Sequence, residues 1–363
     1  MDKTAIILNY PSHYREEVYL KIEKEFDCDF YFGDIEKDTI KSIDFSKFKK
    51  KNQFRTIILA GNWNWISNTV ILSFKNYKNY LLTGEPYCVS SWCILLINKI
   101  LGKKTYLWTH GWYGNEAGFK KFIKKIYFNL STKVLLYGEN AKKLMIDEGV
   151  CHKKLRVIYN SLNYDEQVII RNSLSDTEYF VHKFNNTNPV IIFTGRITKI
   201  KKLDLLLEAQ HILFSKGIIV NVFIVGEGVE LQALKKLVMN YKTADYVSFY
   251  GSCYDEAKIA EFYYNATCCV SPGNVGLTGI HAMTYGCPVI SHDNFSTQMP
   301  EFEVIEDGKT GYFFKEDDAD SLAKSIEMLI QENKVKFRSA CMKVVDTKWN
   351  SNNQIRIFKE ELL

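Results

Sequence analysis

The chain has 363 residues, of which 46% are hydrophobic and 25% charged, an ordinary composition for a globular protein. Its length exceeds the size at which single hydrophobic cores usually stop growing, so we expect two domains. The net charge of +5 is too small to indicate nucleic acid as a partner, and no apolar run is long enough for a membrane-spanning helix.

The first half alternates compact apolar runs, expected as strands, with segments of helical spacing. The strands are expected at 4–10, 56–61, 105–111, 133–138 and 155–160. The helices are expected at 14–26, around 90–101, at 119–130 and at 139–149. Continuous apolar strands separated by helices are typical of a parallel sheet that is covered on both faces. The polar, asparagine-rich stretch 163–189 has no clear period and indicates a linker.

After this stretch the alternation of strands and helices restarts. Strands are expected at 189–195, 219–228, 246–252, 267–273 and 288–293, and helices at 202–216, 229–242, 255–265 and 277–285. The sequence therefore predicts an α/β protein with two Rossmann-like, doubly wound domains facing across a cleft. The expected segments are an N-terminal domain (1–170), a linker (171–188), a C-terminal domain (189–345) and a last helix (346–363) that could pack back on the N-terminal domain.

Ligands of doubly wound sheets bind at the carboxyl ends of the strands, so the loops that follow the strands are the candidate sites. The loop "TGRITKIKKLD" places Arg196 and Lys201 after Gly195. The fork of donors on arginine and the point charge of lysine both suit phosphate oxygens, although a solvated basic loop explains this stretch equally well. The next loop has Gly226 and Gly228, which permit close backbone approach to a ligand or simply tight packing.

The stretch "SPGNVGLTGIHAMTYGCPVI" (271–290) combines a glycine-rich turn with the start of a short helix. Gly273 and Gly276 would let the backbone come close to a ligand. The helix expected from Leu277 would point its free N–H groups and the positive end of its dipole at the crevice, which is an anion site. His281 lies three residues after Thr278, on the same face of that helix.

Five segments of the second half, taken together, have an order and spacing that resemble those of a known family. They are "GRITKIKKLDLLLEA", "VGEGVE", "VSFYGS", "GNVGLTGIHAMTYGCPVI" and "EDGKTGYFF". Over roughly 189–330 the chain resembles the C-terminal domain of retaining glycosyltransferases of family 4, the glycogen-synthase-like group with the GT-B fold. The resemblance implies transfer of a sugar, with retention and without a metal or other cofactor, from a nucleoside diphosphate sugar to a hydroxyl. A UDP-sugar is the favoured donor, and a glycan or lipid-linked saccharide of bacterial surface polysaccharide synthesis is the implied acceptor.

The resemblance also assigns roles in the C-terminal, nucleotide-sugar-binding domain. Arg196 and Lys201 would hold the diphosphate and stabilise it as it leaves. The remaining donor-binding residues would be Gly195 and Gly226 in the loops after their strands, Ser252 and Tyr254 near the base, and Gly276, Leu277 and Thr278 at the phosphates.

The chain departs from the family at two positions of that domain. The family commonly has two glutamates separated by seven residues, where this sequence has Gly273 and His281. Asn274 then becomes the nearby polar candidate for a sugar hydroxyl. His281, which the positive helix end should keep neutral, could hydrogen-bond a ribose hydroxyl; a histidine satisfied within the core is the alternative.

The N-terminal, acceptor-side domain has polar and aromatic residues after its expected strands. The candidate acceptor-binding residues are His13, Tyr14, Arg15, Asn62, Trp63, Trp112 and Tyr113. For Trp63, an apolar cover over the sheet is a rival interpretation. The family often has a histidine near the transferred sugar in the region of His110, so the resemblance implies a catalytic contact there.

The helix expected at 119–130 has an apolar stripe and four lysines. The stripe is Phe119, Phe122, Ile123 and Ile126, and Lys120, Lys121, Lys124 and Lys125 lie on the opposite side. One interpretation is a helix that packs on its sheet and exposes a solvated basic face. The other is peripheral docking on anionic lipid, which would suit a lipid-linked acceptor.

The chain opens without a signal-peptide pattern, and its nine cysteines include no CxxC pair. We therefore expect a cytoplasmic protein, located on the inner face of the plasma membrane if the docking interpretation holds. Three alternatives stay open: a nucleotide-sugar epimerase of the same fold, a non-catalytic protein that binds sugar nucleotide or glycan, and an NAD-dependent oxidoreductase. The last is disfavoured, because "NYPSHYR" lacks the glycine fingerprint after the first strand.

Overall fold

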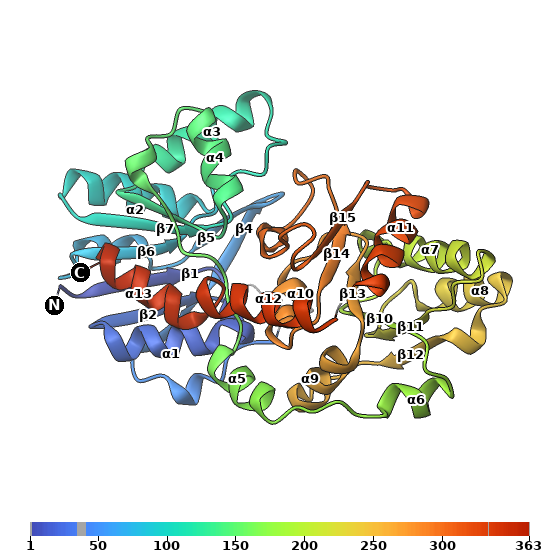
Figure 1. Cartoon of the computed structure of the whole chain (residues 1–363). Helices are drawn as coiled ribbons and strands as arrows, with labels where there is room; N and C mark the ends of the chain where they lie inside the picture. Colours follow the sequence, from blue (N-terminus) through green and yellow to red (C-terminus); the bar gives the residue numbers. More distant parts are fainter. Residues whose placement is uncertain (1, 35–40, 333, 363) are drawn as a thin grey trace. The chain divides into compact units, whose positions relative to one another are not determined.

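The computed structural model describes residues 2–34, 41–332 and 334–362 and divides the chain into two compact units (Figure 1). The first unit is Met1–Asn163 with Asn350–Leu363, and the second is Tyr164–Trp349. The chain therefore enters the second unit before the linker that the sequence pattern suggests. Residues 171–188 include the end of α5 (Tyr164–Asn172) and all of α6 (Tyr179–Phe184). They are ordered in this way because Phe180 of α6 packs on the rings of Phe223 and Phe262.

The first unit contains a parallel sheet with seven strands among the residues described, in the order β3-β2-β1-β6-β7-β8-β9. These strands are β1 (Thr4–Leu8), β2 (Cys28–Gly33), β3 (Lys51–Phe54), β6 (Asn79–Thr83), β7 (Lys104–Thr109), β8 (Lys133–Leu136) and β9 (Leu155–Val157). Successive residues of β1 point to opposite faces, as strand geometry requires. Ile6 belongs to the core cluster under α1 (Glu16–Glu25) and α13 (Ser351–Leu362). Ile7 belongs to the cluster under α2 (Val89–Ile100), α3 (Gly118–Leu130) and α4 (Glu139–Asp147).

One expected core strand lies elsewhere. Residues 56–61 were expected in the buried parallel sheet, but β4 (Thr56–Ala60) pairs with β5 (Trp63–Ile66) in a separate antiparallel hairpin. Ile57, Ile58 and Leu59 are exposed there. In the parallel sheet β1 is flanked by β2 and β6 instead. A short apolar run does not reveal its pairing partner, which is why the expected position was wrong.

The second unit contains a parallel sheet in the order β12-β11-β10-β13-β14-β15. The strands are β10 (Val190–Thr194), β11 (Asn221–Val225), β12 (Val247–Gly251), β13 (Cys268–Ser271), β14 (Val289–His292) and β15 (Gly311–Phe314). The helices include α7 (Leu203–Ser215), α8 (Leu231–Tyr241), α9 (Glu256–Asn265), α10 (Leu277–Thr284), α11 (Ala319–Gln331) and α12 (Lys334–Thr347). Both sheets are doubly wound, with the strand order reversing between β1 and β6 and between β10 and β13. The predicted class of two Rossmann-like α/β domains is confirmed.

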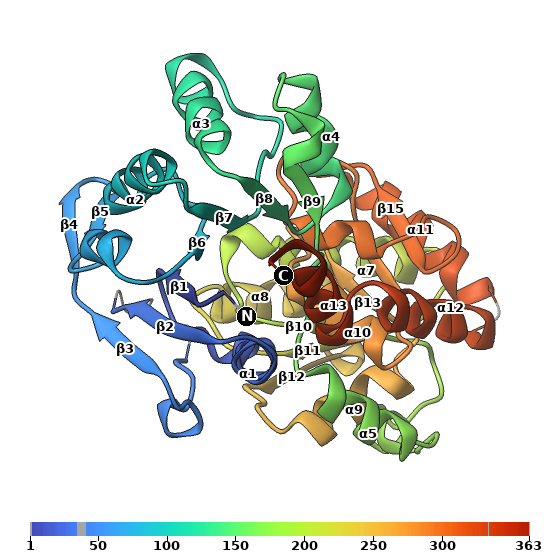
Figure 2. The same cartoon turned by 90° about the vertical axis from the view of Figure 1, so that its left-hand side faces the viewer.

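The C-terminal helix α13 belongs to the first unit although the second unit precedes it in the chain. Lys21 Nζ of α1 donates to Ser351 Oγ at 2.8 Å, and Gln354 Nε2 donates to the Tyr159 carbonyl at 2.7 Å. The ring of Phe358 lies edge-on to Trp108 with 5.2 Å between centroids. Figures 1 and 2 show α13 alongside α1 on one face of the first sheet.

Candidate functional site

The loops that follow β10 and β13 meet where the second sheet reverses its strand order. Lys201, at the end of the loop after β10, donates from Nζ to the carbonyl and to Oδ1 of Asn274, each at 2.7 Å. Arg196 is exposed in the same loop and lies close enough for its charge to act on Lys201. The structure thus brings together three of the predicted site residues from two loops.

The environment of Lys201 disfavours its own positive charge. Burial, and then the repulsion of Arg196, lower the pKa of Lys201 to about 8. The buried carboxylate of Glu301, in the turn Pro300–Val304, opposes this shift. An anion that binds between the two cations would remove the repulsion and compensate the desolvation. The local electrostatics therefore favour an anion beside these two cations.

The start of α10 borders these cations. Gly276, its N-cap, has φ 51° and ψ −155°, a conformation that only glycine adopts without strain. Gly276, Leu277 and Thr278 are half-buried, so the first N–H groups of the helix lie near solvent. The Thr278 hydroxyl donates to the Thr194 carbonyl at 3.3 Å, which ties the helix start to the end of β10.

The glycine-rich loop before α10 is held by Gln298, which the sequence did not single out. Its buried side chain accepts a hydrogen bond from Val275 N at 2.9 Å. The same amide donates to Ser291 Oγ at 2.8 Å and to the His292 carbonyl at 3.0 Å. No motif marks this glutamine, because its contacts depend on the turn that follows β14.

Gly273 is packed against the loop that carries Lys201. A Cβ atom added at Gly273 would lie 2.0 Å from the Ile200 carbonyl oxygen and 2.9 Å from the Lys201 Cα. Backbone therefore fills the space in which a side chain would begin. The absence of a carboxylate at this position fits the close approach of the two loops.

His281 lies on α10 and pairs with a residue that the sequence did not indicate. Its Nε2 is 2.8 Å from Glu256 Oε1, which also accepts from the Tyr285 hydroxyl at 2.5 Å and from Gln167 Nε2 at 3.0 Å. Burial raises the pKa of Glu256, but the charge of His281 and these hydrogen bonds outweigh it and hold that pKa at about 2. Because a carboxylate only accepts hydrogen bonds, Nε2 is the donor in this contact. The sequence analysis did not foresee Glu256 as the partner of His281.

The loops after β11 and β12 carry the other predicted donor-binding residues. Gly226 N donates to the Gly251 carbonyl at 2.8 Å, and Gly195 N donates to the Val225 carbonyl at 2.9 Å, so both glycines join strand ends. Ser252 and Tyr254 are exposed in the loop before α9. They are accessible to a ligand that extends beyond the strand ends.

Several predicted residues of the first unit gather at the carboxyl ends of β7 and β8. His110 Nδ1 and the Tyr113 hydroxyl are 2.8 Å apart, and the His110 ring lies 4.9 Å from the ring of Tyr137. The guanidinium of Arg15 lies over Trp108 at 4.9 Å and over Tyr137 at 5.1 Å. A cation, a histidine and a phenol thus share one edge of the sheet, where a hydroxyl-bearing ligand could be bound.

The other predicted acceptor residues differ in their surroundings. The guanidinium of Arg15 lies over the ring of Tyr14, with 5.6 Å to the ring centroid. His13 is exposed, and its Nδ1 is 3.1 Å from the carbonyl oxygen of Lys41. The ring of Trp112 is only 3% exposed and packs on Phe128, so it forms part of the core and offers no free face.

Asn62 and Trp63 do not directly follow a strand of the parallel sheet, although the contact with Tyr87 places Trp63 beside the loop after β6. They belong to the β4–β5 hairpin, where Trp63 packs edge-on against Tyr87 at 5.6 Å. The sequence placed them at a strand end of that sheet because it took β4 for one of its strands.

Asn9 and Glu85, which the sequence analysis did not select, lie where the first sheet reverses its strand order. Asn9 Nδ2 donates to Glu85 Oε1 at 2.9 Å, and Asn9 N donates to Thr83 Oγ1 at 3.2 Å. Asn9 directly follows β1 and Glu85 follows β6. The position of Asn9 at a strand end was a usable signal, whereas that of Glu85 required knowing that β6 adjoins β1.

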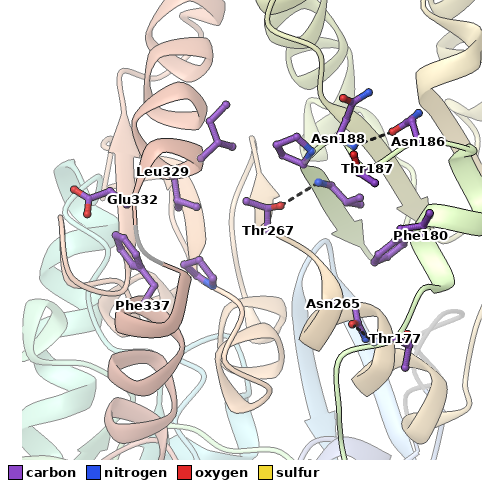
Figure 3. Close-up of a pocket in the computed structure, with 15 residues that line it drawn as sticks. Thr177, Phe180, Asn186, Thr187, Asn188, Asn265, Thr267, Leu329, Glu332 and Phe337 are labelled. Atoms are coloured by element: carbon purple, nitrogen blue, oxygen red, sulfur yellow. Dashed lines mark hydrogen bonds between the residues drawn. The ribbon is translucent and has the colours of Figure 1, made fainter.

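A further pocket of about 340 Å³ opens at the opposite edge of the second sheet (Figure 3). It lies at the amino end of β10, where Val190 N donates to Thr267 Oγ1 at 3.0 Å. Asn188 N donates to Asn186 Oδ1 at 3.0 Å, so the amides on this wall bond to one another. No lysine or arginine is among the described residues that line it.

Within the described part of the chain, histidine, cysteine, aspartate and glutamate nowhere gather in groups of three or more that could hold a metal ion. In the same part of the chain, none of the helices combines the length and the apolar character needed to cross a bilayer.

Comparison with known proteins relates these features to sequence families. Residues 175–343 match the family model described as glycosyl transferases group 1. An uncharacterised 41.2 kDa protein in the cps region of Klebsiella pneumoniae is 24% identical over 324 residues, which cover 86% of this chain and 81% of that protein. The capsular polysaccharide biosynthesis glycosyltransferase CapM of Staphylococcus aureus is 24% identical over 239 residues, or 60% of this chain and 58% of CapM. The match thus spans less than two thirds of CapM.

The fold has a counterpart among solved structures. The crystal structure of Anabaena Alr3699/HepE in complex with UDP is similar with a TM-score of 0.75 and 14% sequence identity. The similarity covers 99% of each chain and shows a shared fold.

Proposed function

We propose that this protein is a glycosyltransferase, which the family match and its named relatives support, and that it moves a sugar from a nucleoside diphosphate sugar to a hydroxyl of a glycan or lipid-linked saccharide. The observation that carries the donor assignment is the meeting of Arg196, Lys201 and Asn274 beside the start of α10. The UDP held by Alr3699/HepE supports UDP as the nucleotide, and the relatives from capsule synthesis support a surface polysaccharide as the product.

In this proposal the cations and the helix start stabilise the leaving group. The bond between the anomeric carbon and the β-phosphate oxygen breaks, and negative charge grows on the diphosphate. Arg196 and Lys201 compensate that charge together with the N–H groups at Gly276, Leu277 and Thr278. Lys201 is the residue most affected by the reaction, because its charge is disfavoured until an anion is present.

We propose that the transfer proceeds with retention. The acceptor oxygen would attack the oxocarbenium-like sugar from the side of the leaving group and pass its proton to a phosphate oxygen. No protein nucleophile is required in this scheme, in line with backbone occupying the space at Gly273 where a side chain would start. Metal independence is part of the same proposal, since the positive charges needed at the phosphates come from side chains and helix amides.

The remaining donor contacts follow from the positions of the side chains. Asn274 would bind a sugar hydroxyl, and the exposed Ser252 and Tyr254 would contact the base. Glu256 holds the Nε2 side of His281, so Nδ1 is the atom that would meet a ribose hydroxyl. Both side chains keep partial exposure, 22% for His281 and 28% for Glu256, and a ligand can therefore reach them.

The acceptor would bind to the first unit and react in the cytoplasm, where nucleotide sugars are the co-substrates. His110 is proposed to contact the acceptor or the transferred sugar, with Tyr113 and Arg15 beside it. Tyr14 and His13 lie in the short helical turn His13–Arg15, between the end of β1 and the start of α1. A lipid-linked acceptor would bring the enzyme to a membrane surface, and helix α3 is the candidate contact with that surface.

The donor assignment is tested by measuring UDP binding to Arg196→Ala and to Lys199→Ala by isothermal titration calorimetry. Lys199 is an exposed lysine of the same loop outside the proposed site, so it controls for a general loss of positive charge. Arg196→Ala should weaken UDP binding roughly tenfold or more, the value of one charge-assisted hydrogen bond. Lys199→Ala should leave binding within about twofold. Equal affinity of Arg196→Ala and the wild type would refute the assignment.

Turnover then distinguishes the reaction types. The proposed transferase consumes a UDP-sugar rapidly only when an acceptor glycan is present. An epimerase would convert the donor sugar without an acceptor, and that result would contradict the proposal.

A further inference from the structure

The first half of helix α3 projects from the first unit with its apolar residues exposed. Phe119, Phe122 and Ile126 are 73%, 57% and 39% exposed, and the two phenyl rings stack on each other at 6.3 Å. The core contacts come instead from Tyr127 and Phe128, which are fully buried. Figures 1 and 2 both show α3 at the margin of the first unit. The inward packing expected for the apolar stripe is thus not what the structure has.

The charge on α3 is entirely positive. Residues 118–130 contain four lysines and no acidic residue. Lys124 points inward, where it pairs with Glu116 at 2.5 Å. Lys121 pairs with Glu148 of the loop after α4 at 2.7 Å, while Lys120 and Lys125 form no ion pair with any described residue.

We propose that this side of α3 docks on a lipid bilayer that contains anionic lipids. The docking surface, named here the α3 surface, consists of the exposed stripe Phe119, Phe122 and Ile126 together with the lysines of the opposite side, Lys120, Lys121 and Lys125. Phenylalanine side chains enter the boundary between head groups and acyl chains, and lysines reach from their apolar stems to lipid phosphates. An exposed apolar, aromatic side together with a lysine-rich polar side is the combination typical of a helix that lies in the membrane interface.

The charge distribution favours a bilayer over a second copy of the chain. Two copies joined through this helix would bring their lysines together, and like charges repel. A bilayer with anionic head groups supplies both an apolar layer for the phenylalanines and opposite charge for the lysines.

The buried side of α3 connects the α3 surface to the residues proposed for the acceptor. Glu116, the partner of Lys124, also accepts from Tyr113 N at 3.0 Å. Tyr113 in turn contacts His110 at the end of β7. Docking of α3 would therefore hold the His110 end of the first sheet near the lipid surface, where a lipid-linked acceptor is found. The docking itself does not depend on the donor chemistry.

The test measures partition of the purified protein onto sucrose-loaded vesicles by sedimentation. One set of vesicles is phosphatidylcholine alone, and the other includes phosphatidylglycerol. The variants are Phe119→Asp with Phe122→Asp, and Lys120→Glu with Lys125→Glu. Met239→Asp, at an exposed apolar position of α8 in the second unit, is the matched control.

The wild type and Met239→Asp should sediment with phosphatidylglycerol vesicles and be released by raised salt. Each double variant should lose roughly tenfold or more of the partition coefficient. All proteins should bind UDP alike and unfold at the same temperature, so failure of docking and failure of the donor assignment are separate results. The proposal is overturned if the wild type does not partition or the double variants partition equally well. It is also overturned if the protein self-associates without lipid and the double variants disperse it.

Discussion

His281 Nε2 and Glu256 Oε1 lie 2.8 Å apart, in a hydrogen bond between helices α10 and α9 that joins residues 25 apart in the sequence. The ring of Tyr263 lies 5.2 Å from that of His281, and its hydroxyl hydrogen-bonds to Thr194, the residue before Gly195. The pair is thus connected to the loop that carries Arg196. Its integrity should matter both to the fold of the second unit and to the donor site.

Glu256→Gln should lower the free energy of unfolding by about 1–3 kcal/mol, because a charged acceptor of three hydrogen bonds is replaced by a neutral amide. If Glu256 orients His281 toward a ribose, the substitution should also weaken binding of UDP much more than binding of free pyrophosphate. Urea denaturation and calorimetry measure the two effects. Lys258→Ala, at an exposed position on the same helix, is the control. Equal losses for UDP and pyrophosphate would argue against the ribose contact.

The same pair predicts a pH dependence of stability. The pKa of Glu256 is about 2 in the folded protein and 4.5 ordinarily, so its stabilisation is present above pH 4.5 and is lost as pH falls toward 2. The difference in unfolding free energy between the wild type and Glu256→Gln should therefore shrink between pH 5.5 and 3. Urea titrations across this range measure it. A difference that stays constant would contradict the depressed pKa.

Lys201 predicts a pH dependence of nucleotide binding. Its pKa of about 8 means that the unliganded site loses a positive charge as pH rises through 8. The diphosphate of UDP is fully ionised above about pH 7.5, since the second pKa of a phosphate is about 6. The UDP affinity should therefore decline from pH 7.5 to 9.5, with proton uptake on binding above pH 8. Lys201→Met should bind weakly and without this decline, whereas a flat profile for the wild type would refute the prediction.

Gly273 should not tolerate a side chain. Since a Cβ atom there would lie 2.0 Å from the Ile200 carbonyl oxygen, Gly273→Ala should cost about 1–3 kcal/mol of stability and displace the Lys201 loop. Gly273→Glu, which introduces the carboxylate common in the resembling family, should be at least as unstable and should bind UDP less tightly. Thermal unfolding and calorimetry test this. Unchanged stability together with improved turnover would show that the two loops can separate.

Gln298 should support donor binding without touching the donor. Gln298→Ala removes the acceptor for Val275 N and should cost about 1–3 kcal/mol, because the buried N–H loses its partner. Gln298→Glu keeps that acceptor but loses the donors to Ser291 and His292. UDP binding should fall in both variants, and more in the alanine variant. If UDP affinity is unchanged in the alanine variant, the loop does not need this anchor.

The sequence predicted the features that depend on local pattern. Apolar runs alternating with helical spacing indicated the two doubly wound domains, and loops after strands led to Arg196, Lys201 and Asn274, which the structure brings together. Features that depend on distant partners were missed. The hairpin position of β4 depends on its pairing with β5, and the contacts of Gln298 depend on a loop 23 residues away. The α3 stripe has the spacing of a packed helix, and spacing alone does not tell which side is covered.

The discontinuous make-up of the first unit has a consequence for how the protein is synthesised. Helix α13 covers one face of the first sheet through Ile355, Ile357 and Phe358, yet the ribosome makes it after the entire second unit. Until then the nascent first unit lacks part of its cover, while the second unit is a single uninterrupted segment that can fold as it emerges. A frameshift or protease cut near residue 350 would therefore damage the half of the protein that was translated first.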